Sequence, residues 1–370
     1  MTDTPLLFSP IKLAGVTFPS RVFVSPMCQY SSVDGFANDW HLVHLGSRAV
    51  GGAALITTEA AAVVPEGRIS PQDLGIWKEE HVPALRRIVE FLHGQGTRAG
   101  VQLAHAGRKA SMAAPWNGEK LVGPEDGGWT NVVAPSAIAF APHYAQPQAL
   151  DIEGIVRVID AFRQATRRAM AAGFDVIEIH AAHGYLLNTF LSPLSNHRAD
   201  EYGGSFEGRS RLLVHVVDAV REEWPLESPL FVRISATDWT EGGWNVADSV
   251  RLATVLKGRG VDLIDASSGG VVAGATIPVG PGYQTPFSAR IRKEAGIATG
   301  AVGMITSPEQ AEHILRTGQG DVVSLAREML RDPYWPLHAA QKLGFAASWL
   351  KQYLRAAHRE NPARAGLESK

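Results

Sequence analysis

Two histidines and a tyrosine lie close together near the middle of the chain and carry side chains suited to acid–base or metal chemistry. His180 and His183 have the spacing H-x-x-H, and Tyr185 follows two residues later. A histidine pair can supply two ligands to a metal ion, although no cysteine lies nearby to complete a ligand set. Buried structural histidines have the same spacing, and two imidazole N–H groups can also bind a substrate oxygen. The motif alone leaves these three interpretations open.

Other polar side chains fall within short apolar segments that we expect to be strands. Gln102 lies in one such segment and Arg233 in another. In the segment 175–180 the side chains alternate between two faces, so Glu178 and His180 point the same way and the isoleucines between them point the other way. A buried polar group without a partner costs about 1–3 kcal/mol. The sequence therefore predicts a polar ligand that pairs with these side chains.

Signatures of the common nucleotide-binding loops and of a serine nucleophile are missing. The nearest match to a dinucleotide fingerprint, residues 94–99, follows a predicted helix and opens a strand, which is the reverse of the required order. No P-loop and no G-x-S-x-G elbow occur. Two later segments favour a phosphate site, because Ala301 precedes a turn at Gly303 and Ala326 precedes the guanidinium of Arg327.

The elements that must position these side chains alternate regularly along the chain. Short apolar segments predict strands at 21–25, 53–58, 99–104, 175–180, 230–235, 263–267, 299–303 and 321–326. Amphipathic segments predict helices at 44–50, 82–93, 152–172, 209–224, 247–259, 287–294, 308–316 and 334–343. Strands that are apolar on both faces are typical of a parallel sheet covered by helices. Eight alternating pairs favour an α/β fold with a single (β/α)₈ TIM barrel, whose active site lies at the carboxyl ends of the strands.

We expect one domain with two appendages. Residues 1–345 are predicted to form the barrel, and residues 346–370 a C-terminal tail. The segment 111–150 is rich in proline, glycine and tryptophan, shows no period, and follows the third strand. Long structureless connections in compact domains are usually functional, so we expect this segment to be an active-site loop or small subdomain.

The composition excludes several classes of protein. The chain has 370 residues, of which 45% are hydrophobic and 19% charged, with a net charge of −2. That balance is globular and favours neither nucleic-acid binding nor attachment to an anionic membrane. No apolar run reaches the roughly 18 residues of a spanning helix, and residues 1–5 do not resemble a signal peptide. Cys28 is the only cysteine, which is consistent with a reducing cytoplasm.

Four motifs, in the right order, resemble the old yellow enzyme family. They begin with Ser25-Pro26-Met27-Cys28-Gln29-Tyr30 and Gln102-Leu103-Ala104-His105-Ala106-Gly107-Arg108-Lys109. The segment from His180 through Tyr185 to Leu186 is similar to the family's catalytic segment, and residues 190–205 are similar to the loop that follows it. The resemblance extends over roughly residues 8–343. Cys28 together with Tyr30 is typical of the "thermophilic-like" branch of this family.

The resemblance implies bound FMN, NADPH or NADH as hydride donor, and ping-pong reduction of activated C=C bonds in α,β-unsaturated carbonyl and related nitro compounds. It implies that His180 and His183 bind the substrate carbonyl, that Tyr185 donates a proton, and that Tyr30 contacts the substrate. It assigns the following residues to the cofactor: Pro26, Met27, Cys28 and Ala60 to the flavin ring, Gln102 and Arg233 to its pyrimidine side, and Ala301, Gly303, Ala326 and Arg327 to the phosphate. Ala326 departs from the glycine usual at its position.

Two further expectations concern assembly and alternatives. In relatives a residue from a neighbouring subunit can enter the active site, so we expect a homodimer or homotetramer in which Tyr353 or Arg355 of the tail has that role. A metal-dependent TIM-barrel hydrolase that uses His180 and His183 is the alternative from another enzyme class. A flavin-binding barrel without catalytic activity is a third hypothesis.

Overall fold

The computed structural model describes residues 4–357 and residue 361. Eight parallel strands form one closed barrel in the order in which they occur in the chain, as predicted. They are β3 (Val22–Val24), β4 (Leu55–Ala62), β5 (Arg98–Ala104), β8 (Val176–Ala181), β9 (Leu230–Ser235), β10 (Leu263–Ser267), β11 (Ala298–Ala301) and β12 (Val322–Leu325). The (β/α)₈ fold class is thereby confirmed.

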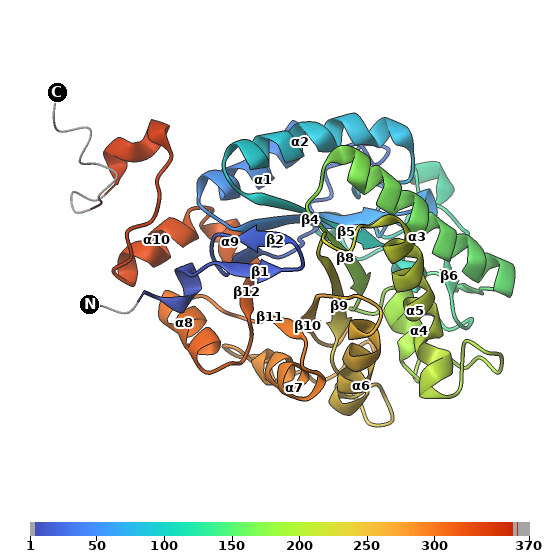
Figure 1. The fold of residues 1–370 in the computed structure, drawn as a ribbon. Coiled ribbons are helices and arrows are strands. Elements are labelled where there is room, and N and C mark those ends of the chain that lie inside the picture. The colour runs from blue at the N-terminus through green and yellow to red at the C-terminus, as the bar shows by residue number, and fades with distance from the viewer. Residues whose placement is uncertain (1–3, 358–360, 362–370) are drawn as a thin grey trace.

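Helices surround the barrel (Figure 1). They are α1 (Asp39–Val50), α2 (Val82–Gly94), α3 (Ile152–Ala172), α4 (Leu186–Leu191), α5 (Phe206–Glu223), α6 (Val246–Lys257), α7 (Thr285–Ala295), α8 (Pro308–Arg316), α9 (Arg327–Arg331) and α10 (Trp335–Lys342). All eight predicted helices are present: α3 and α8 have the predicted ends and the other six have shifted ends. The short α4 and α9 were not predicted. No helix within the described residues is long and apolar enough to cross a bilayer.

Helix α3 shows how local sequence sets these elements. The Asp151 side chain accepts a hydrogen bond from the Gly154 N–H at 2.7 Å and caps the first turn. The helix ends at Gly173, whose φ of +88° is left-handed and costs little without a Cβ. Between these ends, Ile155 and Phe162 belong to the apolar face that packs on the outside of the sheet. A helix that covers one face of a sheet needs only one apolar stripe along its length, and α3 has one.

Apolar side chains fill the space outside the sheet and the amino end of the barrel interior. Polar side chains fill the barrel interior nearer the carboxyl ends of the strands. The outer layer lies between helices and sheet and includes Ile177 and Ile179. The inner layer fills the amino end of the barrel, where Val176 packs among the aromatic rings of Phe23 and Phe231. Along β8 the inward positions therefore change from apolar Val176 to polar Glu178 and His180.

A hairpin that was not predicted closes the amino end of the barrel. It consists of β1 (Ile11–Leu13) and β2 (Val16–Phe18), whose Phe18 packs against Phe23 with ring centroids 5.0 Å apart. Because this end is filled, a ligand can reach the barrel interior only from the carboxyl ends of the strands.

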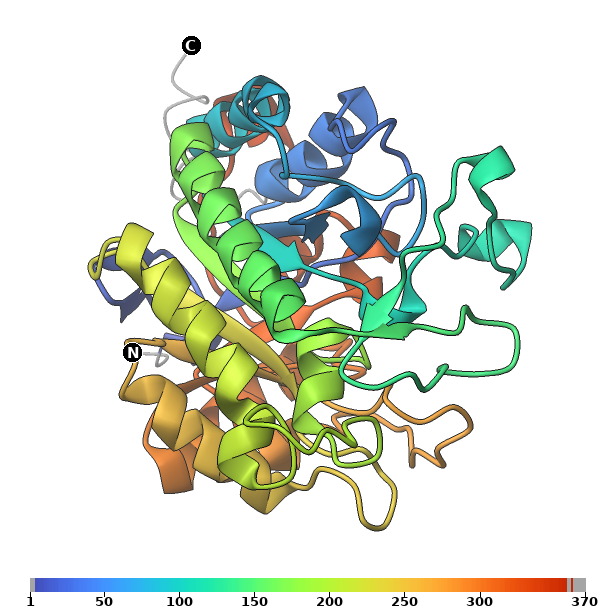
Figure 2. The same cartoon turned by 90° about the vertical axis from the view of Figure 1, so that its right-hand side faces the viewer.

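Residues 111–150 project from the barrel after β5 (Figure 2). They contain two single-turn 3₁₀ helices and two short paired strands, β6 (Val133–Ala134) and β7 (Gln148–Ala149). The tail contains a 3₁₀ helix, Lys351–Ala356, in which the Tyr353 ring lies 6.3 Å from that of Tyr334 and is 46% exposed. The division into barrel, active-site loop and tail stays a prediction.

Candidate active site

The predicted catalytic side chains come together at the carboxyl end of β8. The His180 ring centroid lies 5.2 Å from that of His183 and 4.9 Å from that of Tyr185, with both ring pairs nearly perpendicular. The His183 and Tyr185 rings are 6.5 Å apart. Two imidazoles and one phenol thus face a common region at the mouth of the barrel.

The backbone after β8 is held in an unusual conformation that fixes these rings. His183 has a φ of +60°, which is uncommon for a residue with a side chain. Its N–H donates to the Ser235 Oγ at 2.9 Å, and its carbonyl accepts from the Lys109 Nζ at 2.8 Å. A Cβ at Gly184 would lie 2.0 Å from the carbonyl oxygen of Gly270, so only glycine fits there. Contacts from three neighbouring strand–loop units therefore hold this turn.

Both imidazoles are neutral. Burial, with the charges of Arg233 and Lys109, lowers the pKa of His180 to about 3 and the pKa of His183 well below its usual value. The Ala182 N–H donates to the Nδ1 of His180 at 3.3 Å, so neutral His180 carries its proton on Nε2. His183 Nε2 lies 2.7 Å from the Ser267 Oγ. Neutral imidazoles can donate N–H groups to a substrate oxygen without losing a proton to it.

The phenol and thiol at the mouth stay protonated. Burial is the main cause that raises the pKa of Tyr185, and neighbouring Cys28, Tyr30, Asp73 and Tyr144 add to it. Burial and the charges of Asp73 and Glu59 raise the pKa of the Cys28 thiol. Tyr185 is thus a proton donor rather than a base, and Cys28 is not a thiolate nucleophile.

The loop after β3 lies beside these rings, held by a buried carboxylate. This loop contains Pro26, Met27 and Cys28, and the next N–H, of Gln29, donates to the Glu59 Oε2 at 2.9 Å. Glu59 also pairs with His41 at 3.1 Å. Ala60 follows Glu59 in β4, where the pairing with β5 shifts register. Tyr30 has a φ of +49°, and its ring lies 5.7 Å from that of Trp116 in the long loop.

Four polar side chains on adjacent strands form the layer below the mouth. The Gln102 Nε2 donates to the Glu178 Oε1 at 2.7 Å. The Arg233 Nη1 lies 3.6 Å from the Asp265 Oδ2. The Arg233 Nε and the Asp265 Oδ1 are buried without a hydrogen-bond partner among the described residues. A buried donor and a buried acceptor without partners, just below a barrel mouth, indicate a polar ligand.

A cavity of about 230 Å³ continues from this layer to the last two strands. Its lining includes Arg233, Ser267, Gly303, Ala326 and Arg327, and Ala301 ends the adjacent strand β11. Gly303 has a φ of +124°, which only glycine adopts without strain. Among the described residues the Arg327 guanidinium has no hydrogen bond or ion pair. The cations of Arg233 and Arg327, the second without an ion pair among the described residues, suit the binding of a phosphate ester.

These observations satisfy the requirements of FMN. The orphaned Arg233 Nε and the amide of Gln102 suit the polar edge of a flavin, and the cationic cavity suits its phosphate. The predicted site residues, drawn from seven strands or the loops that follow them, lie on one rim. Sequence reasoning missed Ser267, although it ends a predicted strand, and Lys109, which only the backbone turn brings to His183.

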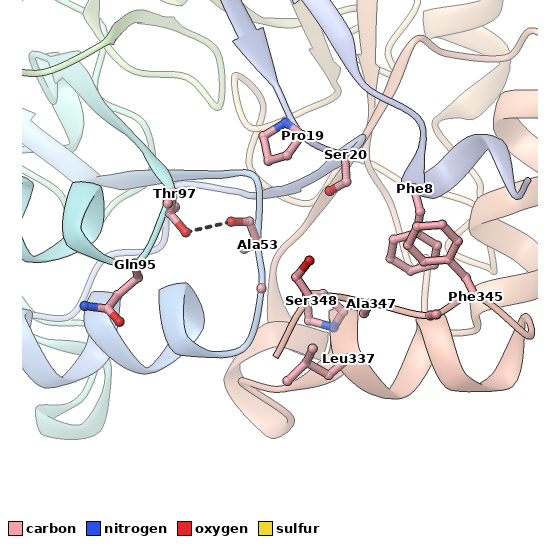
Figure 3. A pocket seen from close by; sticks show the side chains of 14 residues that line it. Phe8, Pro19, Ser20, Ala53, Gln95, Thr97, Leu337, Phe345, Ala347 and Ser348 are labelled. Atoms are coloured by element: carbon pink, nitrogen blue, oxygen red, sulfur yellow. Dashed lines mark hydrogen bonds between the residues drawn. The ribbon is translucent and has the colours of Figure 1, made fainter. Parts of the chain in front are cut away.

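A cavity of about 350 Å³ lies at the other end of the barrel (Figure 3). Part of its lining comes from the turns that precede β4 and β5, where the Thr97 Oγ1 donates to the Ala53 carbonyl at 2.9 Å. The rest includes Phe8, near the start of the chain, and Phe345, which follows α10; their rings stack. Since these turns are at the amino ends of β4 and β5, this cavity is separate from the catalytic rim.

The metal-hydrolase alternative has no support. Within the residues described, no group of three or more His, Cys, Asp and Glu side chains is arranged to hold a metal ion. His180 and His183 lack a third ligand, and a catalytic zinc site normally has three.

Comparisons with known proteins agree with the geometry. The family model described as "NADH:flavin oxidoreductase / NADH oxidase family" matches residues 6–344. An NADPH dehydrogenase of Geobacillus sp. (strain WCH70) is 52% identical over 352 residues, which is 95% of this chain and 98% of that protein. The NADPH dehydrogenase of Bacillus subtilis (strain 168) is 47% identical over 351 residues, 94% and 98% of the two chains.

Solved structures give the same result. Morphinone reductase superposes with a TM-score of 0.78 at 28% identity and covers 94% of this chain and 91% of its own. The old yellow enzyme homologue from Zymomonas mobilis superposes with a TM-score of 0.75 at 26% identity, covering 97% and 98%. With its barrel, its rim of site residues and this family match, the chain belongs to the NADH:flavin oxidoreductase / NADH oxidase family and is an NAD(P)H-dependent flavin oxidoreductase.

Proposed function

We propose that the protein uses FMN and NAD(P)H to reduce activated C=C bonds of α,β-unsaturated carbonyl and related nitro compounds, with His180, His183 and Tyr185 in contact with the substrate. The observation that carries the proposal is the meeting of two neutral imidazoles and one phenol, with ring centroids within 6.5 Å of one another, above the unpaired Nε of Arg233. A ligand with one electronegative oxygen beside a carbon that needs a proton fits this arrangement.

The cofactor is assigned to the residues that suit it chemically. Pro26, Met27, Cys28 and Ala60 would contact the ring, Gln102 and Arg233 its pyrimidine edge, and the cavity lined by Gly303, Ala326 and Arg327, beside Ala301, its phosphate. When bound, FMN would supply a carrier that takes a hydride from NAD(P)H and passes it to the β-carbon of the alkene. Morphinone reductase, a structural neighbour, has been solved in complex with tetrahydroNAD, which supports a nicotinamide as the hydride donor here.

The two histidines stabilise the charge that develops on the substrate oxygen. As a hydride adds to the β-carbon of an enone, the electrons of the C=C bond move toward the carbonyl and negative charge develops on its oxygen. The Nε2–H of His180, whose tautomer the Ala182 N–H sets, is one donor to that oxygen. His183 is the second donor, and Ser267 orients its ring. Preorganised donors of this kind contribute about 10²–10³ each in rate.

Tyr185 supplies the proton that completes the reduction. Its hydroxyl donates to the α-carbon, while the raised pKa keeps the phenol loaded at every working pH. A phenol is a weak acid, but an enolate carbon is a strong enough base to take its proton. Tyr30, across the mouth and against Trp116, closes the substrate chamber.

The test is anaerobic oxidation of NADPH by 2-cyclohexenone with purified protein. We expect a yellow protein that consumes NADPH in proportion to the enone reduced. A yellow protein that is not reoxidised by enones, nitroalkenes or nitrate esters would refute the substrate assignment and favour the hypothesis of a flavin-binding barrel without catalytic activity. A colourless protein that does not retain added FMN would refute the cofactor.

Assembly and location are further parts of this proposal. We infer a homodimer or homotetramer in which Tyr353 or Arg355 of the tail enters a partner's site; the exposed Tyr353 ring supports this. Deleting the chain after Leu343 should then change the KM for the enone in a protein that still assembles, and unchanged kinetics would contradict it. The single free Cys28 supports a reducing, cytoplasmic compartment.

A further inference from the structure

Three charged side chains lie inside the barrel below the flavin-binding edge, and their charges do not cancel. Glu178 on β8, Arg233 on β9 and Asp265 on β10 are 3%, 6% and 2% exposed. Strand register places Arg233 directly beside Asp265. A small internal cavity next to the two carboxyls is otherwise lined by apolar side chains and neutral hydroxyls, those of Ser25, Thr57 and Ser324.

One guanidinium between two carboxylates would leave a net negative charge in a low-dielectric interior. An uncompensated buried charge is far more costly than a proton bound at neutral pH, so such pairs keep a proton. Burial and the Asp265 charge raise the pKa of Glu178 to about 8, opposed by Arg233 and Gln102. Burial raises the pKa of Asp265 as well, and Arg233 opposes that rise. His180 and His183, whose pKa values the Arg233 charge helps to lower, are both neutral, and Tyr283, whose pKa burial raises, stays protonated.

Both members of the pair contact residues assigned to the flavin edge. The Glu178 Oε1 accepts the Gln102 Nε2–H at 2.7 Å, and Asp265 lies 3.6 Å from Arg233. The Asp265 Oδ1 and the Ser25 Oγ are buried without partners among the described residues. A protonated carboxyl has an O–H that can donate a hydrogen bond, and the unpaired Ser25 Oγ can accept one.

We propose that Glu178 and Asp265 share one proton at neutral pH and that, in alkaline solution where the oxidised pair has lost this proton, the pair binds it again when the flavin is reduced. This inference rests on the proposed function, because it requires FMN at Gln102 and Arg233. Two electrons from NAD(P)H add negative charge beside Arg233, so the pair receives less of that cation's field. Its proton affinity rises, and one proton from solvent binds the carboxylate. The proton leaves again when the substrate takes the electrons. Glu178 and Asp265 are positioning residues, which act through Gln102 and Arg233.

The test is the two-electron midpoint potential of the FMN-loaded protein, measured by spectroelectrochemistry from pH 6 to pH 10. One additional proton per two electrons steepens the fall of the potential by about 30 mV per pH unit. We expect this extra slope above about pH 8, where Glu178 is ionised in the oxidised protein. Glu178→Gln keeps the acceptor for Gln102 and removes the titration, so it should lose the extra slope. Glu222→Gln, an exposed α5 carboxylate paired with Arg163, is the control for charge and should retain it.

A second variant separates a shared proton from a structural effect. Asp265→Asn removes the neighbouring charge that raises the pKa of Glu178, so the steep region should move to lower pH rather than disappear. This variant also keeps the test available if Glu178→Gln does not fold. Equal slopes at every pH in the wild type and in the folded variants would refute the shared proton while the proposed function stands. A wild-type protein that does not hold FMN would refute both.

Discussion

Replacing Tyr185 by phenylalanine tests the catalytic assignment most directly. The ring keeps its edge contact with His180, at 4.9 Å between centroids, so the chamber keeps its shape. The hydroxyl has no hydrogen-bond partner among the described residues, so its loss leaves no orphaned group behind. We therefore expect the free energy of unfolding to change by about 1 kcal/mol or less.

The kinetic effect should be large and confined to one half-reaction. A positioned general acid contributes about 10²–10⁴ in rate, which corresponds to about 3–5 kcal/mol of activation free energy. Reoxidation of the reduced enzyme by 2-cyclohexenone should slow by that factor, because the α-carbon loses its proton donor. Reduction by NADPH needs no proton from Tyr185 and should change less than about threefold.

Anaerobic stopped-flow spectrophotometry of the flavin measures both half-reactions separately. Tyr202→Phe is the matched control and should behave like the wild type, because the Tyr202 hydroxyl lies 3.3 Å from the Nδ1 of His215 on α5 and not at the barrel mouth. If Tyr185→Phe slows both half-reactions equally, or slows neither, the phenol is not the proton donor and the catalytic assignment of Tyr185 is wrong.

Three further substitutions test the oxygen-binding pair, the phosphate cavity and a buried acid. His180→Ala should slow enone reduction by about 10²–10³. Because burial lowers the pKa of His180 to about 3, the wild-type kcat/KM for the enone should show no histidine titration from pH 5 to pH 8. A fall in kcat/KM at acidic pH that His180→Ala abolishes would contradict this. Arg327→Gln should weaken FMN binding about 10–100-fold in equilibrium dialysis, whereas Arg331→Gln, in the same cavity but paired with Glu328, should not. Burial and the Glu59 charge raise the pKa of Asp73 to about 8. Between pH 4 and pH 8 the folded state therefore holds a proton that the unfolded chain has lost. The free energy of unfolding should fall over this range by up to about 1.4 kcal/mol per pH unit. Chemical denaturation should show this slope reduced in Asp73→Asn and unchanged in the exposed Asp126→Asn; equal slopes in all three proteins would contradict the assignment.

The barrel and most of its rim follow from local pattern. Strands such as β8 are marked by apolar side chains on the outer face, and alternation alone places Glu178 and His180 inside. Helices such as α3 carry their own cap and terminating glycine. Because eight such units repeat in order, the parallel barrel and the edge at which the polar residues gather were predictable, and a family resemblance added their expected roles.

Tertiary structure decided what local pattern does not encode. Short α4 and the closing hairpin β1–β2 are too brief to show a period, and their conformations depend on contacts with distant residues. The turn at His183 is held by Ser235, Lys109 and the carbonyl of Gly270, from three other parts of the chain. The uncancelled charge of Glu178, Arg233 and Asp265 exists only because three strands bring them together. Side-chain periodicity is a property of neighbours in sequence, whereas electrostatic balance depends on neighbours in space.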